Sequence, residues 1–232
     1  MYAAHFATAL LFHCYYPSVN SFLFTFGVMF LDIVFAILAY FTIEGIRLNP
    51  NAGLLGFELH CPFSHSLLGS FVLSCLWGCM CVVHKTTNFL PVFLSSFSHF
   101  LEDWLIHNRH LQLHPFSSFC VGGTGLCSKY PRGTYYLEFI LCICCSAEIY
   151  RRKNFDLSMI GISLFLSILY IFYLHFQFRP SVSGQFTKFV KAIPDKQQQG
   201  RILFPMLLKL FVTPALVLGV LLEFPRFMRL FT

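Results

Sequence analysis

Charged side chains are scarce in this sequence: they make up 11% of its 232 residues, against roughly 25% in a typical soluble domain. Hydrophobic residues make up 56% of the chain, and the mean hydropathy is +0.67. A chain of this composition is expected to precipitate without lipid, which excludes an ordinary soluble globular domain. The composition therefore predicts an integral membrane protein.

The N-terminus lacks the basic region and the small-residue cleavage site of a secretory signal peptide. We therefore expect the first apolar segment to belong to the mature fold. The sequence also lacks internal repeats and low-complexity tracts, which gives no reason to expect a repeat architecture.

Long apolar runs are the main structural signal. A helix that crosses a bilayer needs about 20 predominantly apolar residues. Such runs fall near 21–45, 66–84, 88–107, 134–150, 157–177 and 203–222. Because the fourth run is short, the sequence predicts an all-α, polytopic bundle with five or six transmembrane helices. The distribution of Lys and Arg between the loops does not fix its orientation.

Cysteine, in contrast, is abundant, with 10 residues. Six of them lie within the predicted spans, where a free thiol behaves as a small hydrophobic group. These are Cys75, Cys79, Cys81, Cys142, Cys144 and Cys145. We expect packing rather than a disulfide framework, and the cysteines at 142, 144 and 145 are too closely spaced for a zinc site.

Three side chains that commonly bind metals lie four residues apart in one apolar segment. They are His99, Asp103 and His107. At 3.6 residues per turn they fall on one face of a helix. Ionisable groups are costly in an apolar environment, so this cluster indicates a functional site that faces a bundle interior or a wet cavity.

Two predicted helical hairpins bring further candidates to the same side of the bundle. The apolar stretch 3–14 turns near residue 17 and runs back, which sets His5 level with Asp32. In the second hairpin His65 lies opposite about residue 109, level with His107. The simpler alternatives are a helix–helix polar contact for Asp32 and a helix cap for His65.

Neutral imidazoles with one or two carboxylates suit Zn²⁺ or another divalent transition metal. Such an ion lowers the pKa of bound water towards about 7. A second carboxylate nearby takes a proton or binds a second metal, and Asp103 is the candidate for either role. The predicted metal ligands are His5, Asp32, His65, His99, Asp103 and His107.

Several other polar residues receive no role in this site. His110 and His114 lie in or beside a polar loop and are expected to be bystanders. Glu102 is expected to face away from its neighbour Asp103 on the helix. His13, His84 and His175 are assigned to interfaces or packing.

The motifs together resemble a known family. The segments that carry the resemblance are Met1–Ala7, Leu31–Asp32, Ile43–Arg47, Pro62–Leu68 and Ser98–Trp104. They resemble, in order and spacing, the membrane-bound metal-dependent hydrolases of bacterial inner membranes. The order of ligands is also similar to that of zinc-dependent phospholipase C and the P1-type nucleases. The resemblance covers residues 1–116, and the loop 121–126 is similar to a glycine-rich loop of the family.

This resemblance implies a helical fold whose metal site hydrolyses a phosphoester. It implies Asp32, His65, His99 and Asp103 as the main ligands, with His5 and His107 as further ones. Glu44 and Arg47 are implied to bind a phosphate or to orient a ligand, so Asp103 and Glu44 are the predicted catalytic residues. The implied location is the inner membrane of a bacterium or of a bacterium-derived organelle.

The chain is expected to divide in two. Residues 1–130 form the predicted metal-site bundle, and residues 131–232 add transmembrane helices with a basic polar loop at 178–201. Of 16 Lys and Arg residues, thirteen lie from Lys129 onward. They fall in loops between spans, which disfavours nucleic acid as a partner and favours anionic lipid headgroups. Ordinary topogenic charge is the alternative explanation.

Three functions are compatible with these patterns. The leading one is a membrane-embedded, metal-dependent hydrolase of a phospholipid or another lipid-linked phosphoester, using metal-activated water. The second is a non-catalytic structural subunit of a larger membrane complex, built on a hydrolase-like fold. The third is a small transporter with intramembrane Asp and His. Against the third, the ligands gather at one face and the two halves show no symmetry.

Overall fold

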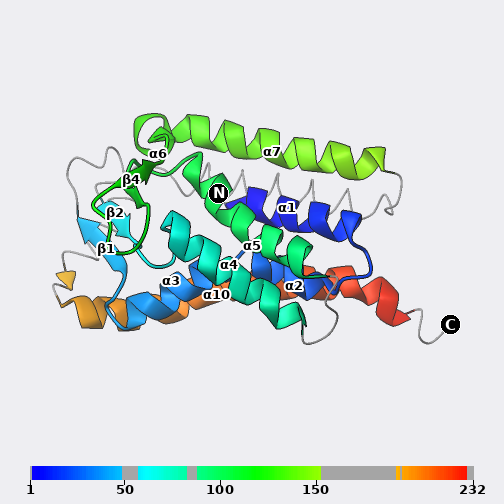
Figure 1. The fold of residues 1–232 in the computed structure, drawn as a ribbon, viewed down its shortest axis with the longest axis horizontal. Helices are drawn as coiled ribbons and strands as arrows, with labels where there is room; N and C mark the ends of the chain where they lie inside the picture. Colours follow the sequence, from blue (N-terminus) through cyan, green and yellow to red (C-terminus); the bar gives the residue numbers. More distant parts are fainter. Residues whose placement is uncertain (1, 49–56, 83–87, 153–191, 194, 229–232) are drawn as a thin grey trace.

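The computed structural model describes residues 2–48, 57–82, 88–152, 192–193 and 195–228 (Figure 1). Its helices are α1 (Tyr2–Tyr15), α2 (Ser21–Gly27), α3 (Phe30–Tyr40), α4 (Leu67–Val82), α5 (Phe89–Trp104), α6 (Leu126–Lys129), α7 (Pro131–Arg151) and α10 (Lys196–Met228). Two short antiparallel hairpins, β1 (Gly45–Leu48) with β2 (Phe57–His60) and β3 (Leu111–Gln112) with β4 (Cys120–Gly122), lie together at one end of the bundle.

The helices pack side by side in an order that differs from their order in the sequence. α1 lies between α7 and α2, α4 pairs with α5, and α10 packs along α3 and α2. The largest buried cluster includes Phe24, Met29, Val92 and Phe211. It joins α2, α5 and α10 into one core. Complete burial of such a side chain stabilises the fold by about 1.5–3 kcal/mol.

A bend separates α2 from α3. Asn20 begins α2 by accepting a hydrogen bond from the backbone N–H of Phe22 at 2.9 Å. The helix ends at Gly27, and α3 continues at an angle of 52°. Side chains from two other helices bind carbonyls at this bend. The indole of Trp77 donates to Leu23 O at 2.9 Å, and His99 Nδ1 pairs with Val28 O.

Two acidic residues, of which Glu138 is buried and Glu148 is partly exposed, attach α7 to both ends of α1. Glu138 accepts the backbone N–H of Ala3 at 2.6 Å and caps the start of α1. At the other end, Glu148 accepts a hydrogen bond from the hydroxyl of Tyr15 at 2.6 Å. Hydrogen bonds from Arg151 and then Tyr15 lower the pKa of the Glu148 carboxyl to about 2. These contacts fix the axial position of α1, and with it the position of its histidines.

The prediction of five or six transmembrane helices is wrong for the part of the chain that the structure describes. Only α10, over Lys196–Phe224, is long and apolar enough by itself to cross a membrane, and the bent pair of α2 and α3 is a second candidate if it counts as one span. The run near 157–177 lies outside the described residues.

The apolar runs predicted too many membrane-spanning helices, and the structure shows the physical reasons. The run at 21–45 is divided by the bend after Gly27. α4 and α5 have 16 residues each, so each rises only about 24 Å, less than a hydrocarbon core of about 30 Å. α7 has 21 residues, but Glu138 and Glu148 interrupt its apolar sequence.

The described helices of the second half pack directly on the first half. α7 lies against α1, and α10 lies against α3 and α2. Most of the basic polar loop predicted at 178–201 falls outside the described residues, which resume fully at 195. The expected boundary near residue 130 therefore lies within one packed body of helices.

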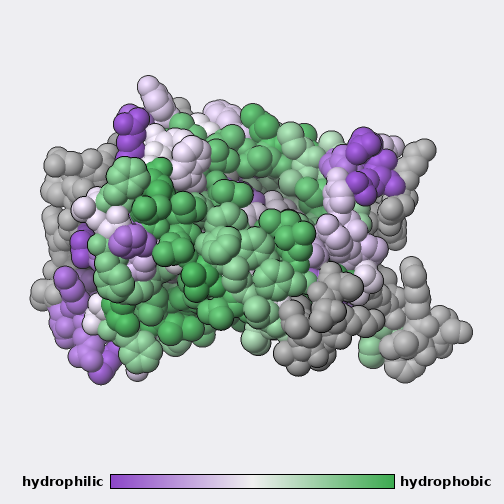
Figure 2. Space-filling view, viewed as in Figure 1, coloured by the Kyte–Doolittle hydropathy of each residue, from purple (hydrophilic) through white to green (hydrophobic). Residues whose placement is uncertain are grey.

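Apolar side chains also cover much of the surface. Figure 2 shows a broad hydrophobic area across the middle of the molecule, with hydrophilic residues gathered towards its two ends. On α4 the exposed apolar residues are spaced three to four apart, which forms a stripe along one face. They are Leu68, Phe71, Val72, Leu76 and Met80. A patch of this kind marks an interaction surface with lipid or protein.

The contact between α10 and α3 depends on a glycine. A Cβ atom at Gly200 would overlap the backbone carbonyl of Ala39. We expect Gly200→Ala to lower the free energy of unfolding by about 1–3 kcal/mol, as overpacking does elsewhere. Thermal unfolding in detergent micelles measures this change.

Gly133→Ala is the matched control for that substitution. Gly133 lies within α7, and its added Cβ would meet Tyr130 at an ordinary 3.4 Å. Alanine is favoured over glycine in a helix, so this variant should be as stable as the native chain or slightly more stable. Equal melting temperatures for the two variants would contradict the close approach of α10 to α3.

Candidate metal centre

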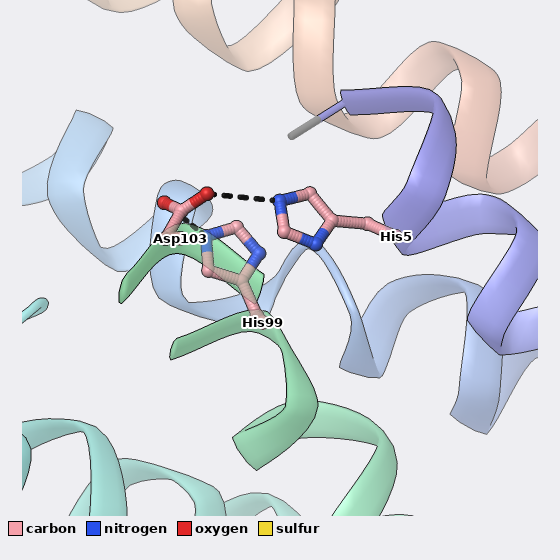
Figure 3. Close-up of side chains that lie close together, drawn as sticks. All are labelled: His5, His99 and Asp103. Carbon is pink, nitrogen blue, oxygen red and sulfur yellow. Dashed lines mark ion pairs between the residues drawn. The ribbon is translucent and has the colours of Figure 1, made fainter. Parts of the chain in front are cut away.

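Side chains from four parts of the chain meet beside the two hairpins. His5 lies on α1, Asp32 on α3, and His99 and Asp103 on α5. His65 precedes α4 directly. The break after α2, the Glu138 cap on α1 and the pairing of α4 with α5 together set their positions. Figure 3 shows His5 and His99 approaching the Asp103 carboxylate from two helices.

The Asp103 carboxylate lies at the middle of this cluster. Its Oδ1 is 3.3 Å from His5 Nε2. Its Oδ2 is 3.3 Å from His107 Nε2, 3.4 Å from His99 Nε2 and 3.7 Å from His65 Nε2. Four imidazoles therefore present the same ring nitrogen to one carboxylate.

Asp32 completes a second group with His65 and His99. The Nε2 atoms of His65 and His99 lie 3.3 Å apart. Asp32 Oδ1 lies 3.5 Å from His65 Nε2 and 3.7 Å from His99 Nε2. Tetrahedral zinc with bonds of about 2.0–2.1 Å separates its ligand atoms by about 3.3 Å. These three atoms are thus spaced as ligands of one ion would be.

The opposite nitrogens of these rings are held by the protein. His99 Nδ1 pairs with Val28 O at the bend between α2 and α3. His65 Nδ1 lies 2.7 Å from Ser64 Oγ, and the Ser64 hydroxyl donates to Glu44 Oε2 at 2.6 Å. Because the Ser64 proton is given to Glu44, Ser64 accepts the Nδ1 proton of His65. The Nε2 atoms of both rings are then left with their lone pairs.

Two lone pairs that face each other at 3.3 Å repel unless a proton or a cation lies between them. Metal-binding histidines commonly donate their other N–H to a carbonyl or to a carboxylate-linked group, which fixes the ring and its tautomer. The partners of His65 and His99 match that arrangement.

Glu102 holds His5 in a similar way. His5 Nδ1 lies 2.8 Å from Glu102 Oε2, and Glu102 Oε1 accepts a hydrogen bond from the Thr8 hydroxyl at 2.6 Å. The His5 ring also stacks on His99, with centroids 4.0 Å apart. Sequence reasoning gave Glu102 no role. Its spacing of three residues from His99 was the signal available, because residues at i and i+3 share a helix face.

The charges of the centre reinforce one another. Burial lowers the pKa of His5, but the Glu102 charge and hydrogen bonds with Asp103 and Glu102 raise it to about 9 overall. Burial opposes ionisation of Asp103, yet the charges of His99 and His107 and a hydrogen bond from His107 hold its pKa well below the usual value. Burial and the charge of His5 lower the pKa of His99. These shifts favour an ionised Asp103 carboxylate beside a neutral His99 imidazole. Burial lowers the pKa of His65, but the hydrogen bond and charge of Asp32 raise it overall, so His5 and His65 favour protonated rings that would have to lose a proton when a metal binds.

Most of the cluster is closed to solvent. His99 is 0% exposed, His5 2% and His65 3%. The side chains of Asp32 and His107 retain exposures of 20% and 14%. Among the described residues of the cluster, access is therefore on the side of Asp32 and His107.

The six predicted ligands all contribute to this network. Two overlapping groups have ligand atoms within 4.8 Å of one another: one is His5, His99 and Asp103, and the other is Asp32, His65 and His99. His107 lies beyond the end of α5, but its backbone N–H still bonds to Asp103 O at 2.8 Å. This bond extends the helical turn far enough for its ring to reach Asp103.

The two other predicted site residues lie outside the cluster. Glu44 acts through Ser64 on His65, so it is placed to position a ligand. Arg47 lies on β1, on the rim of a separate cavity. Sequence reasoning did not find the roles of Ser64, Thr8 and the Val28 carbonyl, because a hydroxyl or carbonyl partner leaves no distinctive sequence pattern.

Comparison of the chain with protein-family models, curated proteins and solved structures found no match. The geometry of the centre and the motifs described above are what support a function.

Proposed function

We propose that this protein is a membrane-anchored, divalent-metal-dependent hydrolase of a phosphoester, such as a phospholipid or another lipid-linked headgroup. The observation that carries this proposal is the convergence of His65 Nε2, His99 Nε2 and Asp32 Oδ1 at 3.3–3.7 Å. The imidazole-rich ligand set favours zinc or a similar transition ion over Mg²⁺ or Ca²⁺, which prefer oxygen ligands.

The chemistry divides between the bound ion and the side chains around it. A divalent ion held by Asp32, His65 and His99 would lower the pKa of a bound water towards about 7 and so supply the nucleophile for hydrolysis. Asp103 accepts a proton at its carboxylate, and His5 faces its Oδ1 atom at 3.3 Å. Glu44, through Ser64, orients His65. The partial exposure of Asp32 gives a substrate its route to the centre.

The membrane location rests on α10 and on the apolar surface. The segment Lys196–Phe224 is 29 residues long, and only 28% of its most apolar window is buried inside the protein. An apolar helix with so little of its surface covered needs a lipid environment. We infer that α10 anchors the protein in the membrane, where anionic lipids are the expected partners.

The burial of the centre favours a second candidate function. Structural zinc sites are closed by protein ligands, whereas catalytic sites keep an open position. His5, His65 and His99 are almost fully buried. In this alternative, the protein is a non-catalytic subunit of a membrane complex, its apolar faces contact other subunits, and the ion joins α1, α3 and α5.

Hydrolysis by the purified protein separates the two candidates. We expect the zinc-loaded protein in maltoside micelles to hydrolyse bis(4-nitrophenyl) phosphate to nitrophenolate and nitrophenyl phosphate, or phosphatidylglycerol to diacylglycerol and glycerol phosphate, as measured by release of nitrophenolate or of glycerol phosphate. Asp103→Asn removes the proton acceptor and should lower turnover by about 100-fold or more.

Glu148→Gln is the matched control, because it converts a carboxylate to an amide at the far end of α1. It should leave turnover unchanged. Stoichiometric zinc without turnover in the native chain would support the structural subunit and contradict the hydrolase.

A further inference from the structure

A separate cavity lies between the β1–β2 hairpin and the start of α10. It has a volume of about 100 Å³, and its lining includes Arg47, His60, Lys196 and Gln199. A cavity of this volume has room for more than a single water molecule, so a small polar group fits in it. The two cations come from distant parts of the chain, one from β1 and one from the first residue of α10.

Glu44 is the acidic residue among those that line the cavity, and its carboxylate is hydrogen-bonded by groups of the protein. Glu44 accepts hydrogen bonds from Phe63 N at 2.7 Å, Ser64 N at 2.9 Å and Ser64 Oγ at 2.6 Å. These three donors offset part of the carboxylate charge. Arg47 and Lys196 are the two Lys or Arg residues in the lining and favour an anion there, while Glu58 stands opposite Arg47 in the hairpin and Asp195 precedes Lys196 in the sequence.

The position of the cavity along α10 identifies the level at which it would meet a membrane. Lys196 begins the segment that is long enough to span, and polar residues 197–199 and Arg201 follow it. The helix becomes apolar only after these residues. In a membrane-anchored α10, Lys196 therefore lies at the headgroup level, where basic side chains bind lipid phosphates.

We propose that this cavity binds the phosphate group of a phospholipid headgroup. Arg47 supplies a planar guanidinium, and Lys196 supplies an ammonium group, the two cations that proteins use for phosphate. Glu44 connects this site with the metal centre, because it lines the cavity and also orients His65 through Ser64. The membrane level of the site rests on the proposed anchoring by α10, but anion binding itself does not require hydrolysis.

Binding measurements on the full-length protein in maltoside micelles test the proposal. The probes are inorganic phosphate, monomeric dihexanoyl phosphatidylglycerol and dihexanoylglycerol, each titrated by calorimetry. We expect the phosphatidylglycerol to bind more tightly than inorganic phosphate and the dihexanoylglycerol not to bind. The double variant Arg47→Gln/Lys196→Gln should weaken phosphatidylglycerol binding at least 10-fold.

The matched control is Arg151→Gln/Lys209→Gln, which removes two cations away from the cavity and should retain native binding. Native affinity in the Arg47/Lys196 variant, or equal affinity for dihexanoylglycerol, would overturn the proposal. Inorganic phosphate that binds as tightly as the lipid, and is lost in the same variant, would assign the cavity to free phosphate and overturn its lipid part.

Asp32→Asn separates this proposal from the proposed hydrolase. Asp32 belongs to the metal centre and does not line the cavity. This variant should lose turnover and keep phosphatidylglycerol binding. If the native chain binds the lipid through Arg47 and Lys196 but never turns over, the hydrolase fails and the phosphate site stands. Loss of lipid binding in Asp32→Asn would contradict two independent sites.

Discussion

Replacement of Asp32 and His99 by alanine is expected to abolish metal binding. His99 belongs to both groups of candidate ligands, and Asp32 supplies the carboxylate of one of them. The double variant leaves His65 Nε2 without either partner within its group. Because a metal site needs three or four well-placed ligands, bound zinc should fall from stoichiometric to background. Mass spectrometry of the metal in purified protein measures this loss.

His13→Ala is the control for that experiment. His13 is a buried histidine on α1, with an exposure of 5%, and it is absent from both groups of ligands. It tests whether loss of any buried imidazole disturbs the fold enough to release metal. Equal metal content in the native chain and in the Asp32/His99 variant would rule out the site proposed here.

Removal of the metal is expected to lower the thermal stability of the native protein strongly. An ion bound by Asp32, His65 and His99 joins α3, the segment before α4, and α5. A ligand present at 1,000 times its dissociation constant stabilises the folded state by about 4.1 kcal/mol. For a chain of this size, about 1 kcal/mol corresponds to a shift of roughly 2–4 °C in Tm. Chelation should therefore lower the Tm by roughly 8–16 °C.

Scanning calorimetry with and without EDTA measures this shift. The Asp32→Ala/His99→Ala variant is the control, and its Tm should not respond to the chelator. A second variant, Ser64→Ala, keeps every ligand but removes the group that orients His65. Loss of such a partner typically weakens metal affinity about 10–100-fold, so its response to EDTA should begin at a lower chelator concentration. A native Tm that is unchanged by EDTA would contradict a metal that joins these helices.

The grouping of the candidate ligands could be predicted from the sequence because it depends on helical periodicity. His99 and Asp103 are one turn apart on a single helix. The predicted hairpins set His5 level with Asp32 and His65 level with His107, whereas the ion pairs of His5 in the structure are with Glu102 and Asp103 of α5. The groups that bind the opposite ring nitrogens of these histidines could not be predicted in this way. The pairing of His99 with the Val28 carbonyl depends on a bend that apolar composition does not encode.

The predicted number of transmembrane helices was too high because apolar composition does not show where a helix bends or ends. Hydropathy measures the length of an apolar run, but it does not show where a helix stops. The run at 21–45 contains two helices, α2 and α3. The 16-residue helices α4 and α5 are apolar yet too short. Composition alone therefore does not give the number of helices that are long enough to cross a membrane.

The cap that Glu138 provides has a consequence for how the centre forms. Its carboxylate binds the N–H groups of Ala3 and Ala4, only one and two residues before His5. A fragment that ends at residue 130 would lose this cap, and loss of an N-cap typically costs about 0.5–2 kcal/mol. It would also remove Cys142, which packs on Ala3 and Ala7. The first 130 residues contain every candidate ligand, yet the start of the helix that carries His5 is held by a residue of α7. We therefore expect a chain shortened after residue 130 to hold His5 less firmly at the centre.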